Sequence, residues 1–288
     1  MINQIAVAGA GTMGSGIAMA AAQSGFSVTL YDTNDAILEK ARHVISKNLN
    51  FLIEKQKITA VESKEISGRI LFSTSINDCK ADLVIEAIVE IAEAKIGLFN
   101  KLAALNTLKT IFASNTSSLS INTLQQGIPG PQRVAGMHFF NPAQIMKLVE
   151  IVKGEQTDAA VTDELMQVCI KMNKTAVLCK DAPGFIVNRV ARHYYLEAMN
   201  LVEQNIAGFE NVDEIMEASG FKMGPFRLMD LIGMDINLAV SESLYEAFGQ
   251  EQRFKPSAIQ KEKVLNNELG KKTGKGFYTY AGEKNDHL

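Results

Sequence analysis

The sequence is poor in cysteine, and its three thiols show no spacing that would bind a metal ion. Cys79, Cys169 and Cys179 are scattered singly through 288 residues, and an odd number cannot all pair within one chain. We therefore expect reduced thiols buried as small apolar side chains, as in a protein of the cytoplasm. No group of histidine, cysteine, aspartate and glutamate residues has the spacing of a metal site, so no metal is expected.

Long apolar runs and an excess of positive charge are also missing. The apolar run at residues 17–22 is too short to span a bilayer, and no basic stretch precedes an apolar one at the N-terminus. We expect neither a membrane partner nor a signal peptide. The net charge of -3 and the lack of a basic stripe argue against a nucleic-acid partner.

What is present suits a globular protein of two domains, with 47% hydrophobic and 21% charged residues. Strand-like and helical stretches alternate up to Pro183-Gly184, and the chain beyond is nearly all helical. The alternation predicts an α/β, Rossmann-like, doubly wound and mostly parallel sheet in residues 1–183, followed by an all-helical domain in residues 184–288. The expected C-terminal features are helices at 185–205, 225–232, 235–248 and 257–268, a capping box formed by Asn211 and Glu214, and a flexible basic loop at 270–276.

A glycine-rich turn follows the first predicted strand, residues 4–8. Its residues are Gly9, Gly11, Thr12, Met13 and Gly14, in the pattern G-x-G-x-x-G. A helix at 17–23 and a strand at 26–31 follow, and that strand ends at Asp32. In dinucleotide-binding units the glycines allow a tight turn, close approach of the pyrophosphate and close helix packing, and the acid accepts ribose hydroxyls of NAD. The alternative is a glycine-rich turn in another α/β protein, with Asp32 as a helix cap.

A histidine and a glutamate lie on two further predicted strands. His138 ends the strand at 134–137, Asn141-Pro142 breaks the chain, and Glu150 sits within the next apolar run. Alternating strand faces could bring the two side chains together, and a carboxylate behind an imidazole is a general-base arrangement. Taken alone, a pair twelve residues apart is more often unrelated than catalytic.

Two other polar stretches allow two interpretations each. The loop at residues 114–118 follows a strand, where ligands bind in doubly wound sheets, but it could equally cap the helix expected near Ile121. The helix at 35–57 carries Lys40, Lys47, Lys55 and Lys57. These lysines could meet an anionic ligand, or they form a solvated face, which their spacing favours.

Seven motifs together resemble the 3-hydroxyacyl-CoA dehydrogenase family, and most of all its short, single-function bacterial 3-hydroxybutyryl-CoA dehydrogenases. The motifs follow one another in order, and the resemblance covers about residue 2 to residue 280. The motifs are GAGTMGSGIA, IEAIVE, ASNTSSLSI, GMHFFNPAQIMKLVEIV, DAPGFIVNR, GPFRLMDLIGMD and GKKTGKGFY. The resemblance implies a Rossmann-like domain plus a helical domain that forms a homodimer.

The resemblance also implies site residues. His138 matches the family's general base, Glu150 the carboxylate that orients it, Ser117 a contact to substrate and cofactor, and Asn188 the contact to the acyl carbonyl. Further NAD contacts are implied at Glu90, Lys95, Asn141 and Lys272, beside the glycine turn and Asp32. Lys55 matches a coenzyme A contact, whereas Asn48 stands where some relatives carry a contacting serine.

The implied reaction interconverts a short-chain (3S)-3-hydroxyacyl-CoA and the 3-ketoacyl-CoA with NAD(H), the coenzyme A thioester being the substrate. One alternative is a NAD-dependent dehydrogenase of a hydroxy acid without coenzyme A, such as a sugar acid. Another is a NAD-binding structural protein without turnover. The remaining histidines, His43, His193 and His287, are expected to be surface, packed or tail residues.

Overall fold

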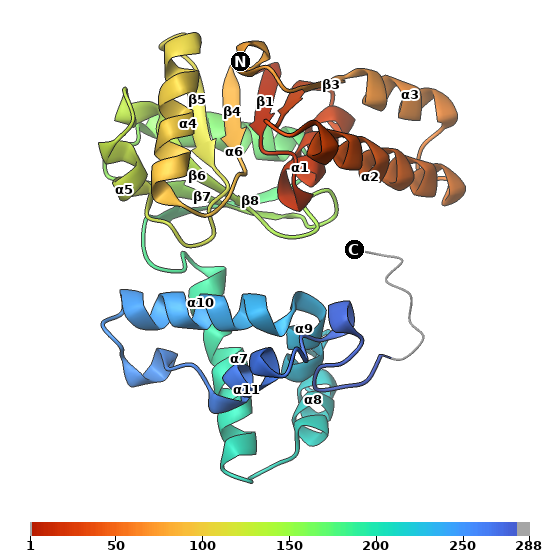
Figure 1. The fold of residues 1–288 in the computed structure, drawn as a ribbon, viewed down its shortest axis with the longest axis vertical. Helices are drawn as coiled ribbons and strands as arrows, with labels where there is room; N and C mark the ends of the chain where they lie inside the picture. The colour runs from red at the N-terminus through yellow and green to blue at the C-terminus, as the bar shows by residue number, and fades with distance from the viewer. Residues whose placement is uncertain (1, 281–288) are drawn as a thin grey trace. The chain divides into compact units, whose positions relative to one another are not determined.

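The structure is a computed structural model that describes residues 2–280. It divides between Ala182 and Pro183 into two compact units, which we call unit 1 and unit 2 (Figure 1). The sequence placed the boundary one residue later, after Pro183. His287 and residues 281–288 of the expected second domain lie outside the described range. Within that range, no helix is both long and apolar enough to cross a lipid bilayer.

Unit 1 is built on one sheet, which in the described residues has eight strands in the order β3-β2-β1-β4-β5-β6-β7-β8. The first six in sequence are mutually parallel, β7 runs antiparallel to β6, and β8 runs parallel to β7. An order of 3-2-1-4-5-6 is that of doubly wound dinucleotide-binding sheets, so the predicted Rossmann-like fold is confirmed. The strands are β1 (Gln4–Ala8), β2 (Ser27–Tyr31), β3 (Ile70–Ser73), β4 (Leu83–Glu86), β5 (Ile111–Ser114), β6 (Val134–Phe139), β7 (Leu148–Lys153) and β8 (Thr175–Lys180).

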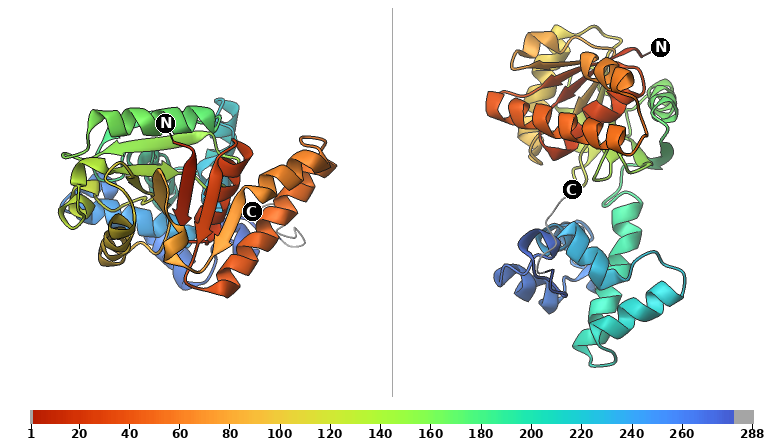
Figure 2. Two further views of the ribbon diagram at one scale, coloured as in Figure 1. Left: turned by 90° about the horizontal axis from the view of Figure 1, so that it is seen from above. Right: turned by 90° about the vertical axis from the view of Figure 1, so that its right-hand side faces the viewer.

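The central strands are apolar because helices cover both faces of the sheet. All four residues of β4 and of β5 are buried, as expected of parallel strands with two covered faces. Figure 2 shows helices on both sides of the sheet, and one core joins α1, α2 and α6 to it. Helices α4 and α5 contact each other, and Phe99 of α4 lies edge-on to Phe112 of β5. The helices of unit 1 are α1 (Thr12–Gln23), α2 (Asp35–Glu54), α3 (Ala60–Gly68), α4 (Ala92–Leu105), α5 (Ile121–Gln126) and α6 (Ala159–Lys171), with 3-10 turns at Ile76–Asp78 and Pro131–Arg133.

Two helix starts in unit 1 differ from the expectation in a way that matters for the site. Helix α1 begins at Thr12 rather than at residue 17, because Gly11 is its N-cap and the glycine turn leads directly into the helix. Helix α4, which the sequence predicts to begin at Glu90, begins at Ala92, so Glu90 lies in the loop after β4 and not on the helix. Both shifts place predicted cofactor residues at loop or helix-start positions, where backbone N–H groups are exposed.

Unit 2 is helical, as predicted, and in its described part only two isolated bridges, within residues 270–279, are extended. Its core is formed by aromatic and methionine side chains, among them Tyr195, Met199, Phe226 and Met229. The helices are α7 (Val187–Glu203), α8 (Phe209–Ala218), α9 (Pro225–Ile232), α10 (Met234–Ala247) and α11 (Ala258–Leu265), with 3-10 turns at Gln252–Phe254 and Lys271–Thr273.

Two expectations for unit 2 are wrong. Asn211 is not an N-cap, because α8 already begins at Phe209 with Gly208 as its cap. The segment at 270–276 is not an irregular loop, because it forms a 3-10 turn at Lys271–Thr273 and the Gly270 N–H bonds to the Lys275 carbonyl at 2.8 Å. The buried carboxylate of Asp230 holds the chain just after it. Asp230 accepts backbone N–H groups from Phe277 and Tyr278, each at 2.9 Å, and the Tyr280 hydroxyl at 3.0 Å.

Helix α11 tests how much a real cap contributes in unit 2. Ser257 accepts the Ile259 N–H at 3.0 Å, and Gln260 accepts the Ser257 N–H at 3.0 Å, which completes a capping box. We expect Ser257→Ala to lower the free energy of unfolding by about 1–2 kcal/mol, the usual cost of losing such a cap. Urea unfolding measures it. The matched control is Asn211→Ala, for which we expect a change below about 0.5 kcal/mol because Asn211 is exposed within α8. Equal losses in both variants would contradict this description of the caps.

Candidate active site

The glycine turn lies where the strand order of the sheet reverses, between β1 and β4. Gly9 follows β1 with a φ of +104°, and a Cβ there would lie 2.5 Å from the Ala87 carbonyl oxygen, just after β4. A Cβ at Gly14 would lie 1.7 Å from the carbonyl oxygen of Gly9. Both positions therefore exclude a side chain, because the turn is pressed against β4 on one side and against α1 on the other.

Gly11 has the opposite surroundings. A Cβ at Gly11 would meet no described atom within 4 Å, and its φ of −64° suits any residue. Its side of the turn is open at the N-terminus of α1, where no side chain caps the first N–H groups. A backbone that is open here, with free N–H groups and a positive helix end, fits a pyrophosphate. The described residues thus meet the geometric requirements of a dinucleotide site.

Asp32 lies at the end of β2 and is bonded to the glycine turn. Its Oδ2 accepts the Ala10 N–H at 2.9 Å, and its Oδ1 accepts the Asn34 N–H at 3.0 Å. The cap of α2 is Asn34, whose side chain accepts the Ala36 N–H, and not Asp32 itself. Asp32 therefore joins the second strand to the turn, at the position from which a dinucleotide-binding acid reaches a ribose.

His138 and Glu150 are brought together by the reversal of strand direction at β7. The two residues are direct partners in the β6–β7 register, so their side chains lie on the same face of the sheet. His138 Nδ1 lies 2.7 Å from Glu150 Oε2, and the side chains are 7% and 1% exposed. The Phe140 ring lies beside the imidazole, with 4.5 Å between the ring centroids. With Nδ1 held by the carboxylate, Nε2 is the nitrogen that can exchange a proton with a substrate.

The loop after β5 is fixed by contacts that the sequence did not reveal. Asn115 Oδ1 accepts the N–H of Phe139, the residue after His138, at 2.9 Å, and the Asn115 N–H bonds to the Glu86 carbonyl at 2.8 Å. The loop also caps α5, through the Ser120 side chain. The cap of α5 thus lies just beyond residues 114–118, and Asn115 of that stretch ties β5 to the strand that carries the histidine.

Glu90 and Lys95 are engaged with each other. Lys95 Nζ lies 3.0 Å from Glu90 Oε2 and 2.7 Å from Glu86 Oε1. Glu90 Oε1 in turn accepts the Ser117 N–H at 3.0 Å. The family motifs implied both residues as cofactor contacts. The sequence did not predict that Glu86, at the end of an apolar strand, pairs with Lys95, because a glutamate is most often a surface residue.

The remaining predicted residues lie on α2, in the loop after β6 and on unit 2. Lys55 and Asn48 belong to the last two turns and C-cap of α2, and Asn141 is exposed in the loop after β6. On unit 2, Asn188 lies in the first turn of α7, and Lys272 forms an ion pair with Asp235.

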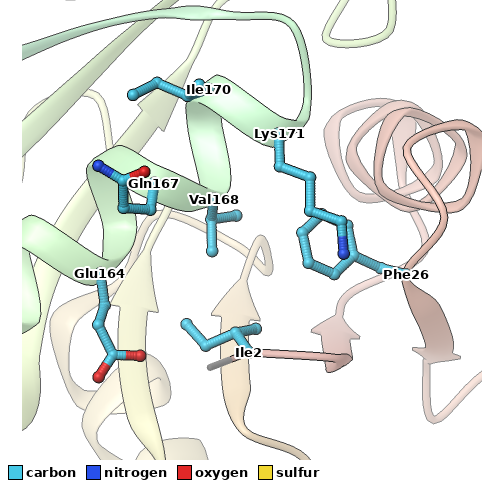
Figure 3. A pocket seen from close by; sticks show the side chains of 7 residues that line it. All are labelled: Ile2, Phe26, Glu164, Gln167, Val168, Ile170 and Lys171. Carbon is cyan, nitrogen blue, oxygen red and sulfur yellow. The ribbon is translucent and has the colours of Figure 1, made fainter.

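A separate hollow of about 430 Å³ lies near the start of β1, at the edge of the sheet opposite the glycine turn. Figure 3 shows Val168 pointing toward Ile2 and the Lys171 side chain running across Phe26, with the ammonium 4.0 Å from the ring centroid. The lining is apolar apart from Glu164, Gln167 and Lys171. It contains no imidazole and no glycine turn, so we assign no role in the chemistry to it.

The comparisons with known proteins agree with this geometry. Residues 4–182 match the family model "3-hydroxyacyl-CoA dehydrogenase, NAD binding domain", and residues 184–280 match the C-terminal domain of the same family. The chain is 42% identical over 281 residues to a probable 3-hydroxybutyryl-CoA dehydrogenase of Bacillus subtilis, covering 97% of this chain and 98% of that protein. The chain belongs to the 3-hydroxyacyl-CoA dehydrogenase family, whose N-terminal domain binds NAD.

Two further relatives show the range of the family. The chain is 45% identical over 285 residues to the 3-hydroxyadipyl-CoA dehydrogenase of Escherichia coli; this is 98% of the chain but 60% of that longer protein. A solved (S)-3-hydroxybutyryl-CoA dehydrogenase from Ralstonia eutropha matches with a TM-score of 0.93 at 36% identity, covering 98% of this chain and all of that one, 100%.

The glycine turn yields a prediction that separates folding from cofactor binding. Gly14→Ala should lower the free energy of unfolding by about 1–3 kcal/mol, because the new methyl group collides with the Gly9 carbonyl. Gly11→Ala should leave thermal unfolding unchanged but weaken NADH binding about 10-fold or more, because the methyl group occupies the open side of the turn. Calorimetric unfolding and fluorescence titration with NADH measure the two effects. Wild-type NADH affinity in Gly11→Ala would contradict the placement of the pyrophosphate.

Proposed function

We propose that the protein interconverts (3S)-3-hydroxyacyl-CoA and 3-ketoacyl-CoA thioesters with NAD(H), with short-chain substrates preferred. The observation that carries this proposal is the 2.7 Å contact between His138 Nδ1 and Glu150, at the sheet edge that also bears the glycine turn. Membership of the 3-hydroxyacyl-CoA dehydrogenase family supports the reaction class. The names of two relatives, which specify 3-hydroxybutyryl-CoA, support the short chain.

His138 acts as the general base when the hydroxy thioester is oxidised. Its Nε2 takes the proton of the C3 hydroxyl, and the imidazolium that forms is stabilised by Glu150 through Nδ1–H. In the reverse direction the imidazolium returns that proton to the ketone oxygen. A carboxylate that is 1% exposed is well placed for this role, because little water competes for its charge.

Ser117 and Asn188 are proposed to hold the substrate. The Ser117 hydroxyl donates to the C3 oxygen, and the Asn188 side-chain amide donates to the thioester carbonyl. Ser117 lies in the loop after β5, which Asn115 ties to the residue following His138. This tie supports a fixed spacing between hydroxyl and imidazole, as a near-attack geometry requires.

NAD is proposed to bind across the carboxyl edge of the sheet. Gly9, Gly11 and Gly14, with Thr12 and Met13, would hold the pyrophosphate, and Asp32 would accept the ribose hydroxyls. When bound, NAD supplies the acceptor for the hydride that leaves C3. Glu90, Lys95, Ser117, Asn141 and Lys272 are proposed as further cofactor contacts by their match to the family motifs.

Helix α2 is proposed to bind the coenzyme A moiety. Six of its residues fall within about 100° of the helix circumference, at 100° per residue. They are Lys40, Val44, Lys47, Asn48, Phe51 and Lys55. Val44 and Phe51 are 37% and 40% exposed, and Lys55 Nζ lies 5.4 Å from the centroid of the Phe51 ring. Exposed apolar surface flanked by ammonium groups suits an adenine ring with phosphates.

A homodimer formed through unit 2 is also proposed. Several large apolar side chains of this unit are at least half exposed, and an interface between two copies would remove them from water. They include Val190, Ile206, Ile215, Phe221, Ile236 and Leu265. Sedimentation velocity would give the mass, and a concentration-independent monomer would contradict the dimer. The proposed location is the cytoplasm, in keeping with the three free thiols.

The central test compares substrates and removes the base. The wild-type protein should oxidise NADH with acetoacetyl-CoA, and the rate of NADH oxidation should fall with longer 3-ketoacyl-CoA thioesters. It should not act on free acetoacetate or on sugar acids. His138→Gln should lower turnover by about 10²–10⁴-fold with NADH binding unchanged, because general-base catalysis is worth that much. His193→Gln, an exposed imidazole on α7, is the control and should keep full turnover. Activity on free hydroxy acids alone, or none at all, would favour one of the two alternatives named from the sequence.

A second test addresses cofactor choice. Asp32→Ala should reduce the ratio of kcat/KM for NAD to that for NADP by about 10-fold or more, because the carboxylate no longer binds the ribose or repels a 2′-phosphate. Steady-state kinetics with both cofactors measure the ratio. An unchanged ratio would show that Asp32 does not bind the ribose and only accepts the backbone N–H groups of Ala10 and Asn34.

A further inference from the structure

A buried cluster of two carboxylates and one ammonium, formed by Glu86, Lys95 and Glu90, lies behind the loop that carries Ser117. Lys95 is 1% exposed and Glu86 0% exposed, whereas the Glu90 side chain is 37% exposed. The reaction proposed above assigns no proton and no substrate contact to Glu86. Two carboxylates facing one ammonium are more than an ion pair needs, and burying a charge is costly unless it is paired.

At one end, Glu90 organises the serine loop. Its Oε1 accepts the Thr116 hydroxyl at 2.5 Å, the backbone N–H groups of Ser117 at 3.0 Å and Ser118 at 3.2 Å, and the Ser118 hydroxyl at 3.1 Å. Burial would raise the pKa of Glu90, but the Lys95 ammonium and these hydrogen bonds outweigh burial and hold the pKa below its usual value. The carboxylate is therefore a fixed negative acceptor around which the loop is wrapped.

At the other end, Glu86 fixes Lys95 to the sheet. Its Oε1 accepts Lys95 Nζ and the Ile88 N–H, both at 2.7 Å, and its Oε2 accepts the Ser114 hydroxyl at 2.7 Å. Glu86 is the last residue of β4 and Ser114 the last of β5, and the two are register partners. Burial raises the pKa of Glu86, and Lys95 opposes that rise. The ammonium, 2.7 Å away, is thus the positive charge that offsets the burial of this carboxylate.

We propose that Glu86 is a positioning residue for Ser117: it anchors Lys95, Lys95 holds Glu90, and Glu90 holds the backbone of the serine loop. The inference rests on the proposed function, because Ser117 must contact the reacting groups for its position to matter. The linkage runs from the rigid ends of two central strands to the loop that faces the substrate. A displacement of about 1 Å in such a loop can cost about 10²-fold in rate.

The test is a double-mutant cycle between Glu86 and Ser117, measured with acetoacetyl-CoA and NADH. Glu86→Gln keeps the shape but not the charge, and it should lower kcat about 10-fold. In a Ser117→Ala background the same change should lower kcat by less than about 2-fold, because the loop then has no hydroxyl to position. Glu65→Gln also removes one carboxylate, and as an exposed control on α3 it should leave kcat unchanged.

The possible outcomes separate this inference from the proposed function. Losses that multiply in the double mutant would overturn the inference, as would a raised KM for NADH with unchanged kcat. If Glu86→Gln does not fold, Ser114→Ala removes the hydroxyl bound to the same carboxylate and should show a smaller loss that is again absent in the Ser117→Ala background. A wild-type protein without turnover of acetoacetyl-CoA refutes the proposed function itself, before any variant is made.

Discussion

The contact between His138 and Glu150 depends on one strand running against its neighbour. The six parallel strands have their carboxyl ends at one edge of the sheet, and His138 lies near that end of β6. Because β7 runs antiparallel to β6, Glu150 lies opposite His138 and on the same face. The carboxylate is almost fully buried, so the N–H of the imidazole is needed to offset the loss of hydration. The imidazole of His138 and the carboxylate of Glu150 therefore stabilise each other without a bound ligand.

Local pattern was enough for the architecture and for part of the site. The strand at 4–8, the glycines and the helix after them follow so closely that only a βαβ unit fits them, and β1 and α9 have the predicted bounds. Strand alternation allowed His138 and Glu150 to share a face, but it was the family motifs that turned this possibility into an expectation. Strand partners and faces follow from such periodicity, since both are repeated over several residues.

Contacts between single side chains and distant backbone were not visible in the sequence. Nothing in the local pattern shows that Asp32 accepts the Ala10 N–H, or that Asn115 accepts the N–H of Phe139. Asn211 illustrates the opposite error. An asparagine with a glutamate three residues on fits a capping box, yet the cap of α8 is Gly208, three residues earlier. The roles of Ser117, Asn188, Lys55 and Lys272 came from family motifs, because no periodicity marks them.

The two edge strands of the sheet have a consequence for aggregation of the protein. The order of strands leaves β3 and β8 as outermost strands, with unpaired main-chain groups that could recruit another chain. Leu71 and Leu178 are 54% and 49% exposed on them, so these rims are also sticky. Two features oppose pairing with another chain. Strand β3 is short, with four residues, and follows Arg69, and strand β8 ends at the exposed Lys180. Aggregation during synthesis should therefore respond more to these few cations than to any residue that touches the reactants.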